Sequence, residues 1–163
     1  MLLIFRKMSG INFAQLMDVY SETIVRLGRR DYPNKDEHEQ HFLAEQEQYQ
    51  YFLDCMSCGA VCAVWAPEGL YRSALRLEPY NDGYLLTALE TTPAMRRKGY
   101  AEALVRAVLN AFSDMPIYSH VARANRASIA LHKKCGFSKH LDYATYLDGS
   151  VSAQAVTLIY QQK

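Results

Sequence analysis

Two short motifs, one strand-sized segment apart, hold the residues of this chain that are best suited to chemistry. The first is Arg96-Arg97-Lys98-Gly99-Tyr100-Ala101, which follows a strand-like run at 84–90 and opens a segment with apolar residues at helical spacing. A basic turn between a strand and a helix can bind an anion. The first N–H groups of the helix lack intrahelical acceptors, and Gly99 lets a ligand approach the backbone. The first motif therefore predicts a phosphate-binding turn.

The second motif follows an apolar run at 117–122, and its characteristic positions are Asn125, Ser128, Leu131, His132, Lys134, Gly136 and Phe137. Asn125 suits the N-cap of a helix. A helix that begins there places Ser128 and His132, which are four residues apart, on one face. Two interpretations stay open for these side chains: Asn125 is either a plain cap or a ligand contact, and His132 is either a packed residue or a proton donor.

Two common kinds of site are excluded by spacing. The first motif lacks the Lys-Ser/Thr pair of a Walker loop and the glycine pattern of a dinucleotide-binding turn. Cys55, Cys58 and Cys62 form C-x2-C-x3-C, but no fourth metal ligand stands at a convincing spacing. We therefore expect buried reduced thiols and no metal.

In this order and at this spacing, the two motifs resemble those of the GNAT superfamily of acyl-CoA-dependent N-acyltransferases. Pro93, three residues before Arg96, also fits that family's pattern. The resemblance implies acetyl-CoA as co-substrate and direct transfer of its acetyl group to a primary amine of a small-molecule or peptide acceptor. From a different class of function, a binding module that senses acyl-CoA without turnover is the alternative. The specific motifs cover residues 84–137, and the flanking segments match in element order alone.

The resemblance also implies roles for individual residues. Backbone groups of the strand end would contact the pantetheine arm and thioester, the basic turn would bind the pyrophosphate, and the second motif would lie along the arm. The cofactor-binding residues so implied are Leu89, Thr91, Arg96, Arg97, Lys98, Gly99, Tyr100, Ala101, Asn125 and Ser128.

The candidate catalytic residues are Glu90 and His132. Glu90 ends an otherwise apolar strand and is the leading general base, with Glu78 as second choice; a solvent-facing rim position and a proton relay through water are the alternatives. His132 stands where the family most often has a tyrosine that faces the departing sulfur. The reserve phenols for that role are Tyr118, Tyr143 and Tyr146.

The remaining sequence predicts the elements that must position these residues. We expect strands at 2–8, 60–66, 70–78, 84–92, 117–122, 139–147 and 151–160. We expect helices from Asn12 to a break at 28–33, from an Asn34 cap to Gly59, from Gly99 to Phe112, and from Asn125. This β-α-α-β-β-β-α-β-α-β-β order predicts one mixed α/β domain over residues 1–163, with helices on a mostly antiparallel central sheet.

Composition and charge limit the class of protein. The net charge of +1 argues against nucleic-acid binding, and no apolar run is long enough to span a membrane, so we expect a cytoplasmic protein for which a homodimer is one compatible assembly. Residues 1–30 carry a net +3, 31–93 a net −8 and 94–163 a net +6. The positive last part suits a polyphosphate ligand. The negative middle suits either a cationic amine or a solvated helix face.

Overall fold

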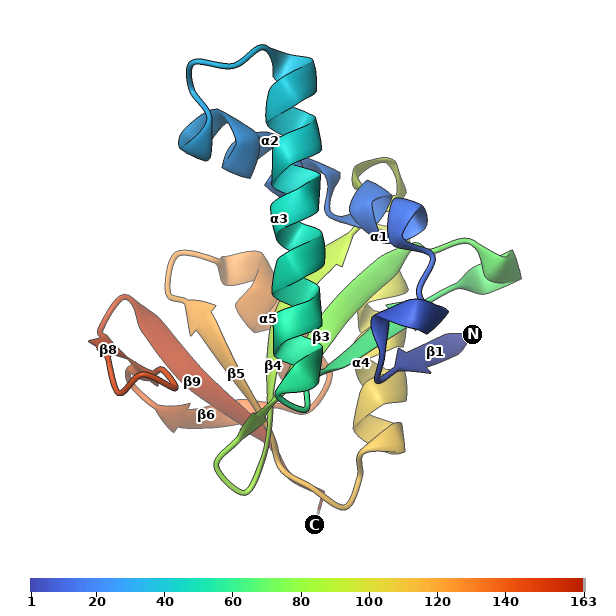
Figure 1. Ribbon diagram of the computed structural model, residues 1–163. Coiled ribbons are helices and arrows are strands. Elements are labelled where there is room, and N and C mark those ends of the chain that lie inside the picture. Colours follow the sequence, from blue (N-terminus) through green and yellow to red (C-terminus); the bar gives the residue numbers. More distant parts are fainter. Residues whose placement is uncertain (163) are drawn as a thin grey trace.

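A computed structural model of the protein describes residues 1–162, and the expected domain end at Lys163 lies outside them. Seven strands form one sheet in the order β1-β2-β3-β4-β5-β9-β6, with helices on both faces (Figure 1). The described elements are β1 (Leu2–Phe5), α1 (Phe13–Val19), α2 (Ser21–Asp31), α3 (Glu37–Ser57), β2 (Val61–Trp65), β3 (Ser73–Tyr80), β4 (Gly83–Thr91), α4 (Tyr100–Ala111), β5 (Ile117–Ala122), α5 (Arg126–Lys134), β6 (Ser138–Leu141), β7 (Ala144–Thr145), β8 (Val151–Ser152) and β9 (Ala155–Tyr160). The predicted single mixed α/β domain with a mostly antiparallel sheet is confirmed.

Two hydrophobic cores lie on opposite faces of the sheet. The buried side chains of α4 and the residues that follow α5 pack on one face, against Val61, Leu75 and Ile117. Helices α1, α2 and α3 pack on the other face, where Cys62 and Val64 point. Successive side chains of β2 therefore point to different cores. Because both faces of the strand are buried, its sequence is apolar at every position.

The first helical region differs from its prediction. It forms two helices, α1 and α2, because the backbone leaves helical geometry at Tyr20 (ψ 17°). The break expected at 28–33 begins later than predicted, because α2 runs through Gly28 and ends at Asp31. Gly28 serves helix packing, since a Cβ there would lie 2.8 Å from the carbonyl oxygen of Gln40 on α3. Glycine is required at position 28 because it has no side chain, which lets α2 and α3 approach each other, and not because it ends the helix.

Other boundaries also differ. The first strand ends at Phe5, and a short 3-10 turn occupies Met8–Gly10. Helix α3 is capped by Asp36, whose side chain accepts from the Glu39 N–H at 2.9 Å, and not by Asn34. The strands expected at 139–147 and 151–160 each divide in two: β6 pairs with β9, and β7 pairs with β8 in a separate two-stranded sheet. The strand expected at 70–78 lies at Ser73–Tyr80.

The sheet opens between β4 and β5. These strands run parallel, and in the described chain they pair only at Tyr84–Ile117, Leu85–Tyr118 and Leu86–Ser119, although β4 continues to Thr91 and β5 to Ala122. At the same level β4 carries a bulge against β3, because Ala74 pairs with Glu90 while Arg76 pairs with Thr87. Ala88, inside the bulge, has a positive φ of 51°. A bulge bends its strand and redirects the side chains that follow.

Candidate functional site

The largest cluster of predicted site residues lines one cavity of about 820 Å³. It lies where the end of β4, the turn before α4, the start of α5 and one side of α2 meet. All the predicted cofactor-binding and catalytic residues line it except Lys98 and His132. Its remaining lining residues are Glu22, Thr23, Arg26, Glu102, Ala127 and Leu131.

The turn before α4 presents backbone N–H groups to this cavity. The first hydrogen bond of the helix runs from the Ala103 N–H to the Gly99 carbonyl at 2.9 Å, so the N–H groups of Tyr100 and Ala101 have no intrahelical acceptor. Arg97 and Gly99 both have positive φ, 62° and 81°. A Cβ on Gly99 would meet no protein atom within 4 Å, so this glycine faces open space on the cavity side. Such a turn forms a cradle for an anion.

The arginine and lysine side chains of the turn have different surroundings. Arg96 lines the cavity, and its guanidinium makes a bidentate contact with Glu22 on α2, at 3.1 and 2.6 Å. This contact joins the turn to α2 across the cavity mouth. Lys98 lies outside the cavity lining, and its Nζ contacts Met95 Sδ at 3.5 Å.

The second motif contributes the start of α5. Asn125 Oδ1 accepts from the Ser128 N–H at 3.1 Å, so the predicted cap is present, and both residues also line the cavity. The two interpretations of Asn125 are therefore compatible, because a cap at the edge of a cavity still exposes its amide to a ligand.

His132 lies in the core between α5 and β5. Its side chain is only 2% exposed and does not line the cavity. Nδ1 lies 2.7 Å from the Ser128 carbonyl, which can only accept, so Nδ1 donates; Nε2, 2.9 Å from Ser119 Oγ, is then an acceptor. Burial lowers the pKa of His132, which keeps the ring neutral. With both ring nitrogens occupied, this placement does not support a donor role toward a departing sulfur.

Glu90 is half-buried in the cavity wall. Its carboxylate accepts from Thr23 Oγ1 at 2.5 Å, which ties the end of β4 to α2. Burial raises the pKa of Glu90, while the hydrogen bond from Thr23 and the charge of Arg26 oppose the shift. A carboxylate with a raised pKa beside a cavity can take up a proton closer to neutral pH than an exposed one.

Sequence reasoning missed the contribution of α2 and of Tyr20. The Tyr20 hydroxyl, on a side chain only 3% exposed, donates to the Ala88 carbonyl at 2.8 Å and so fixes the bulge beside the cavity. The polar positions of α2 gave no sequence signal, because helical spacing identifies the apolar face but not which polar residues border a cavity. Among the reserve phenols, Tyr118 donates to Asp82 at 2.6 Å, and this bond raises the pKa of Tyr118 to about 12.

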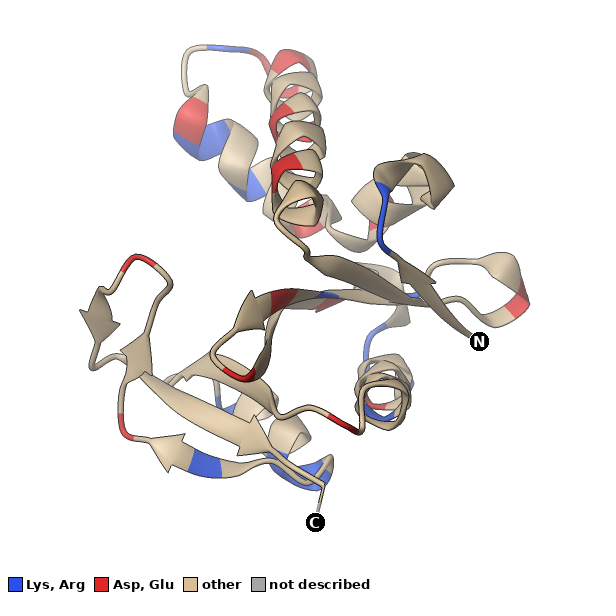
Figure 2. Ribbon diagram, turned by 60° about the horizontal axis from the view of Figure 1, so that its bottom comes forward, with Lys and Arg blue, Asp and Glu red and all other residues tan. Residues whose placement is uncertain are grey.

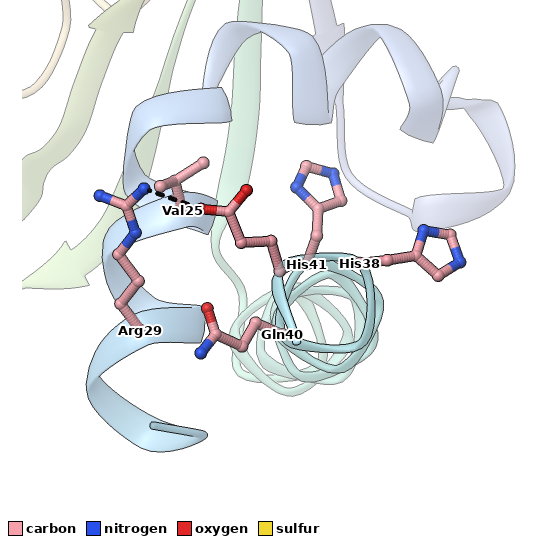
Figure 3. Close-up of a pocket in the computed structure, with 6 residues that line it drawn as sticks. Val25, Arg29, His38, Gln40 and His41 are labelled. Carbon is pink, nitrogen blue, oxygen red and sulfur yellow. Dashed lines mark hydrogen bonds and ion pairs between the residues drawn. The ribbon is translucent and has the colours of Figure 1, made fainter. Parts of the chain in front are cut away.

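A separate hollow of about 340 Å³ lies between α2 and α3 (Figure 3). An ion pair between Arg29 and Glu37 crosses it at 3.4 Å, but these side chains are 66% and 88% exposed, so the pair contributes little to stability. His38 and His41 also line the hollow, and His41 Nε2 contacts Glu45 at 3.0 Å. No residue of either motif lines this hollow, and we assign no chemistry to it.

The acidic residues of the middle segment recur along α3 (Figure 2). Most have local partners: Glu39 pairs with Lys35 at 2.9 Å, Glu45 with His41 and Glu47 with the Tyr32 hydroxyl. These contacts favour the solvated helix face over an amine-binding surface.

Three features of residues 1–162 concern metal binding and membranes: the clustering of possible metal ligands, the burial of the cysteines and the polarity of the helices. No group of three or more His, Cys, Asp or Glu side chains in this range could hold a metal ion. The expected burial of the thiols is confirmed for Cys62, whereas Cys55 is only partly buried. It is wrong for Cys58, which is exposed at the C-terminal end of α3; Cys135 is buried. Within the same range, every helix is too short or too polar to cross a membrane.

Comparison with known proteins agrees with this geometry. The model of the acetyltransferase (GNAT) family matches residues 15–137. PH1933 from Pyrococcus horikoshii OT3 is 16% identical, with a TM-score of 0.64 over 100% of this chain and 99% of that chain. The ribosomal-protein-alanine N-acetyltransferase of Brucella melitensis is 15% identical, with a TM-score of 0.64 over 98% and 99%. The PaiA N-acetyltransferase of Thermoplasma acidophilum, solved with coenzyme A, is 12% identical, with a TM-score of 0.60 over 99% of each chain. At these identities the structures show a shared fold. No curated protein matches the sequence significantly.

Proposed function

The chain belongs to the acetyltransferase (GNAT) family, whose enzymes depend on acyl-CoA, and on that premise we propose that it transfers an acetyl group from acetyl-CoA to a primary amine. The acceptor is a small molecule or a peptide. The observation that carries the proposal is the single cavity in which both sequence motifs and the open end of the β4–β5 pair meet.

The donor groups around the cavity fit the parts of acetyl-CoA. The N–H groups at the start of α4, with the αL residues Arg97 and Gly99, suit the pyrophosphate. Arg96 is close enough to assist once it leaves Glu22. Within residues 1–162, the edge of β4 that faces β5 has no partner strand beyond Leu86, so backbone groups of Leu89 and Thr91 are free to pair with the pantetheine amides. Asn125 and Ser128 line the opposite wall.

Acyl transfer to an amine requires a carbonyl polarised by a donor and an amine that loses its proton. A backbone N–H at the bulge is suited to the first task, because it is held in place before the reaction and costs no reorganisation. Positioning of the two reactants supplies most of the remaining rate. For an amine that enters through this cavity, Glu90 is the proposed base, acting directly or through water.

The non-catalytic acyl-CoA sensor is the competing function. It needs the cradle but no route for an amine and no base. Glu90, held at a raised pKa in the cavity wall, favours the enzyme over the sensor.

The test compares two glycine variants. Gly99→Val places a side chain in the cradle, whereas Gly69→Val makes the same change at another positive-φ glycine (77°) with no atom within 4 Å of its Cβ and no place in the cavity. At acetyl-CoA one hundred times above Kd, wild type should gain about 2.7 kcal/mol. That gain is roughly 5–11 °C in Tm, at about 2–4 °C per kcal/mol.

Gly69→Val should keep this acetyl-CoA-dependent shift, and Gly99→Val should lose it, although both pay the backbone strain of a non-glycine residue at positive φ. Release of free thiol with an amine panel then separates enzyme from sensor. An equal shift in both variants would remove the pyrophosphate assignment, and stabilisation without thiol release for any amine would favour the sensor.

A further inference from the structure

A second cavity, of about 540 Å³, lies along β4 and β5 on the face of the sheet that points away from α4 and α5. Ile117, Ser119 and Val121 of β5 point toward α4 and α5, so His120 and Ala122 must point away from them. Thr87 and Ala88 of β4 complete the shared edge of this cavity, while the next residues, Leu89 and Glu90, line the first one. The first cavity spans the end of the opening, from the starts of α4 and α5 to α2, and the second lies beside it on the face of β4 and β5 that points away from α4 and α5.

His120 is the residue of this second cavity that has unused hydrogen-bonding capacity. Within residues 1–162, its Nδ1 is the buried side-chain nitrogen or oxygen that has no partner. Nε2 lies 3.4 Å from the Tyr80 hydroxyl, which is itself 2.8 Å from the Thr145 carbonyl. Because that carbonyl can only accept, the tyrosine proton goes to it and the Nε2 proton goes to the tyrosine oxygen. A neutral ring then carries its lone pair on Nδ1.

Two aromatic rings hold the imidazole edge to face: Tyr80 at 5.4 Å and Tyr146 at 5.2 Å between centroids. Tyr80 is buried and Tyr146 is 42% exposed, so the cavity reaches the imidazole on the side of Tyr146, which also lines it. Burial lowers the pKa of His120, which keeps the lone pair available at neutral pH.

The lining of this cavity indicates the kind of molecule that fits. Leu85, Leu147 and Ala155 make it largely apolar. Asp148 adds a carboxylate, whose Oδ1 accepts from the N–H and the hydroxyl of Ser150 at 2.8 and 2.6 Å and which has no cationic partner within residues 1–162. Glu78 also lines it, but that carboxylate is already paired with Arg76 at 2.9 Å. An apolar hollow with one carboxylate that lacks a cationic partner suits a compact apolar body that carries a single ammonium group.

We infer that this second cavity binds the acceptor, a small primary amine with an apolar body, and that His120 Nδ1 takes the proton from its nitrogen. The inference rests on the proposed acetyl transfer. As the nitrogen–carbon bond to the acyl group forms, the carbon–sulfur bond breaks and its electron pair leaves on the CoA thiolate. The amine proton stays on His120 and then passes to water. For an amine bound here, His120 replaces Glu90 as the base, and Glu90, in the first cavity, holds α2 against β4 through Thr23.

Binding is tested first, with 2-phenylethylamine as the probe and 2-phenylethanol as the control that lacks the amine. The protein is first saturated with CoA, which cannot donate an acetyl group. In amide-detected NMR of this complex, the amine should shift resonances of residues 85–88, 120–122 and 146–148. Shifts confined to α2 and α3, an equal response to the alcohol, or no response at millimolar amine would each overturn the assignment of the acceptor cavity.

Turnover of 2-phenylethylamine is tested next, by thiol release from acetyl-CoA. His120→Asn keeps a polar group near the Nδ1 position without a basic nitrogen, and it should lower kcat by roughly 10²-fold or more. Its acetyl-CoA-dependent rise in Tm should match wild type. His120→Ala should regain activity on addition of imidazole, a response that a purely structural role would not give.

The outcomes separate the two proposals. Wild-type kcat in His120→Asn, or no imidazole rescue in a folded His120→Ala, overturns the role of His120. Turnover of the polar polycation spermidine in preference to 2-phenylethylamine overturns the acceptor class. A wild-type protein that acetyl-CoA does not stabilise overturns the proposed function itself, whatever the His120 variants do.

Discussion

The hydroxyl group of Tyr20 should control the shape of the cofactor cavity from outside it. It donates to the Ala88 carbonyl at 2.8 Å, in a bulge where Ala88 holds a positive φ of 51°. That conformation costs an alanine about 1–2 kcal/mol, so the bulge must be held by its surroundings. Tyr20→Phe removes the buried donor from a partly buried hydrogen bond, which should lower the free energy of unfolding by about 0.5–1.5 kcal/mol.

The functional consequence should be measurable as acetyl-CoA affinity. The residues after the bulge, Leu89 to Thr91, line the cavity, so relaxation of the bulge moves one wall of the site. A loss of about 1 kcal/mol in binding would raise the Kd for acetyl-CoA roughly fivefold, as measured by isothermal titration calorimetry.

Tyr71→Phe is the matched control. Tyr71 is also buried, and its hydroxyl accepts from the Asn12 N–H at 3.2 Å, away from β4. It should lose a comparable amount of stability, read from urea unfolding, and bind acetyl-CoA with wild-type Kd. If Tyr20→Phe also kept the wild-type Kd, or if both variants lost affinity equally, the bulge would not be the means by which Tyr20 acts.

Two further predictions follow from buried ionisable groups. Glu90→Gln keeps an acceptor for Thr23 but removes a carboxylate whose pKa is raised by burial. Its Tm should therefore exceed that of wild type at pH 7 and match it near pH 4, where Glu90 is protonated. A lower Tm at pH 7 would contradict this. Burial lowers the pKa of His132 in the folded protein. As the pH drops below about 6.5, the histidine therefore becomes protonated more readily in the unfolded chain than in the folded one, and the free energy of unfolding should fall. His132→Gln should reduce that slope in pH-dependent urea unfolding, and an unchanged slope would contradict the assignment.

The parts of the site that the sequence predicts are those that depend on local backbone geometry. Gly99 after a strand and before an apolar helix predicts a turn with free N–H groups, and the structure has that turn. Asn125 predicts a cap, and its side chain accepts from Ser128. Both depend on residues within three or four positions of each other, where the covalent chain limits the alternatives.

The parts that the sequence did not predict depend on contacts between distant segments. Tyr20 fits the apolar spacing of one continuous helix, yet it ends α1 and reaches β4, 68 residues away. Gly28 suggests a helix break when it is read alone, and only the approach of Gln40 explains it. The bulge at Ala88 likewise has no sequence signal, because it depends on the register of β3 against β4.

The two histidines show which periodicity carries the functional information. Helical spacing places His132 on the same face of α5 as Ser128. That spacing does not determine whether the ring points to the cavity or to the sheet. In the structure the ring points to the sheet, where its Nε2 contacts Ser119 on β5. Strand alternation is more restrictive, since a residue that follows Ser119 must point to the opposite face. His120 therefore lies on the face away from α5, beside the opening of the sheet, with an Nδ1 that has no hydrogen-bond partner among residues 1–162. A buried polar atom without a partner costs free energy unless something binds it, and an amine that loses its proton there is a partner of the right chemistry.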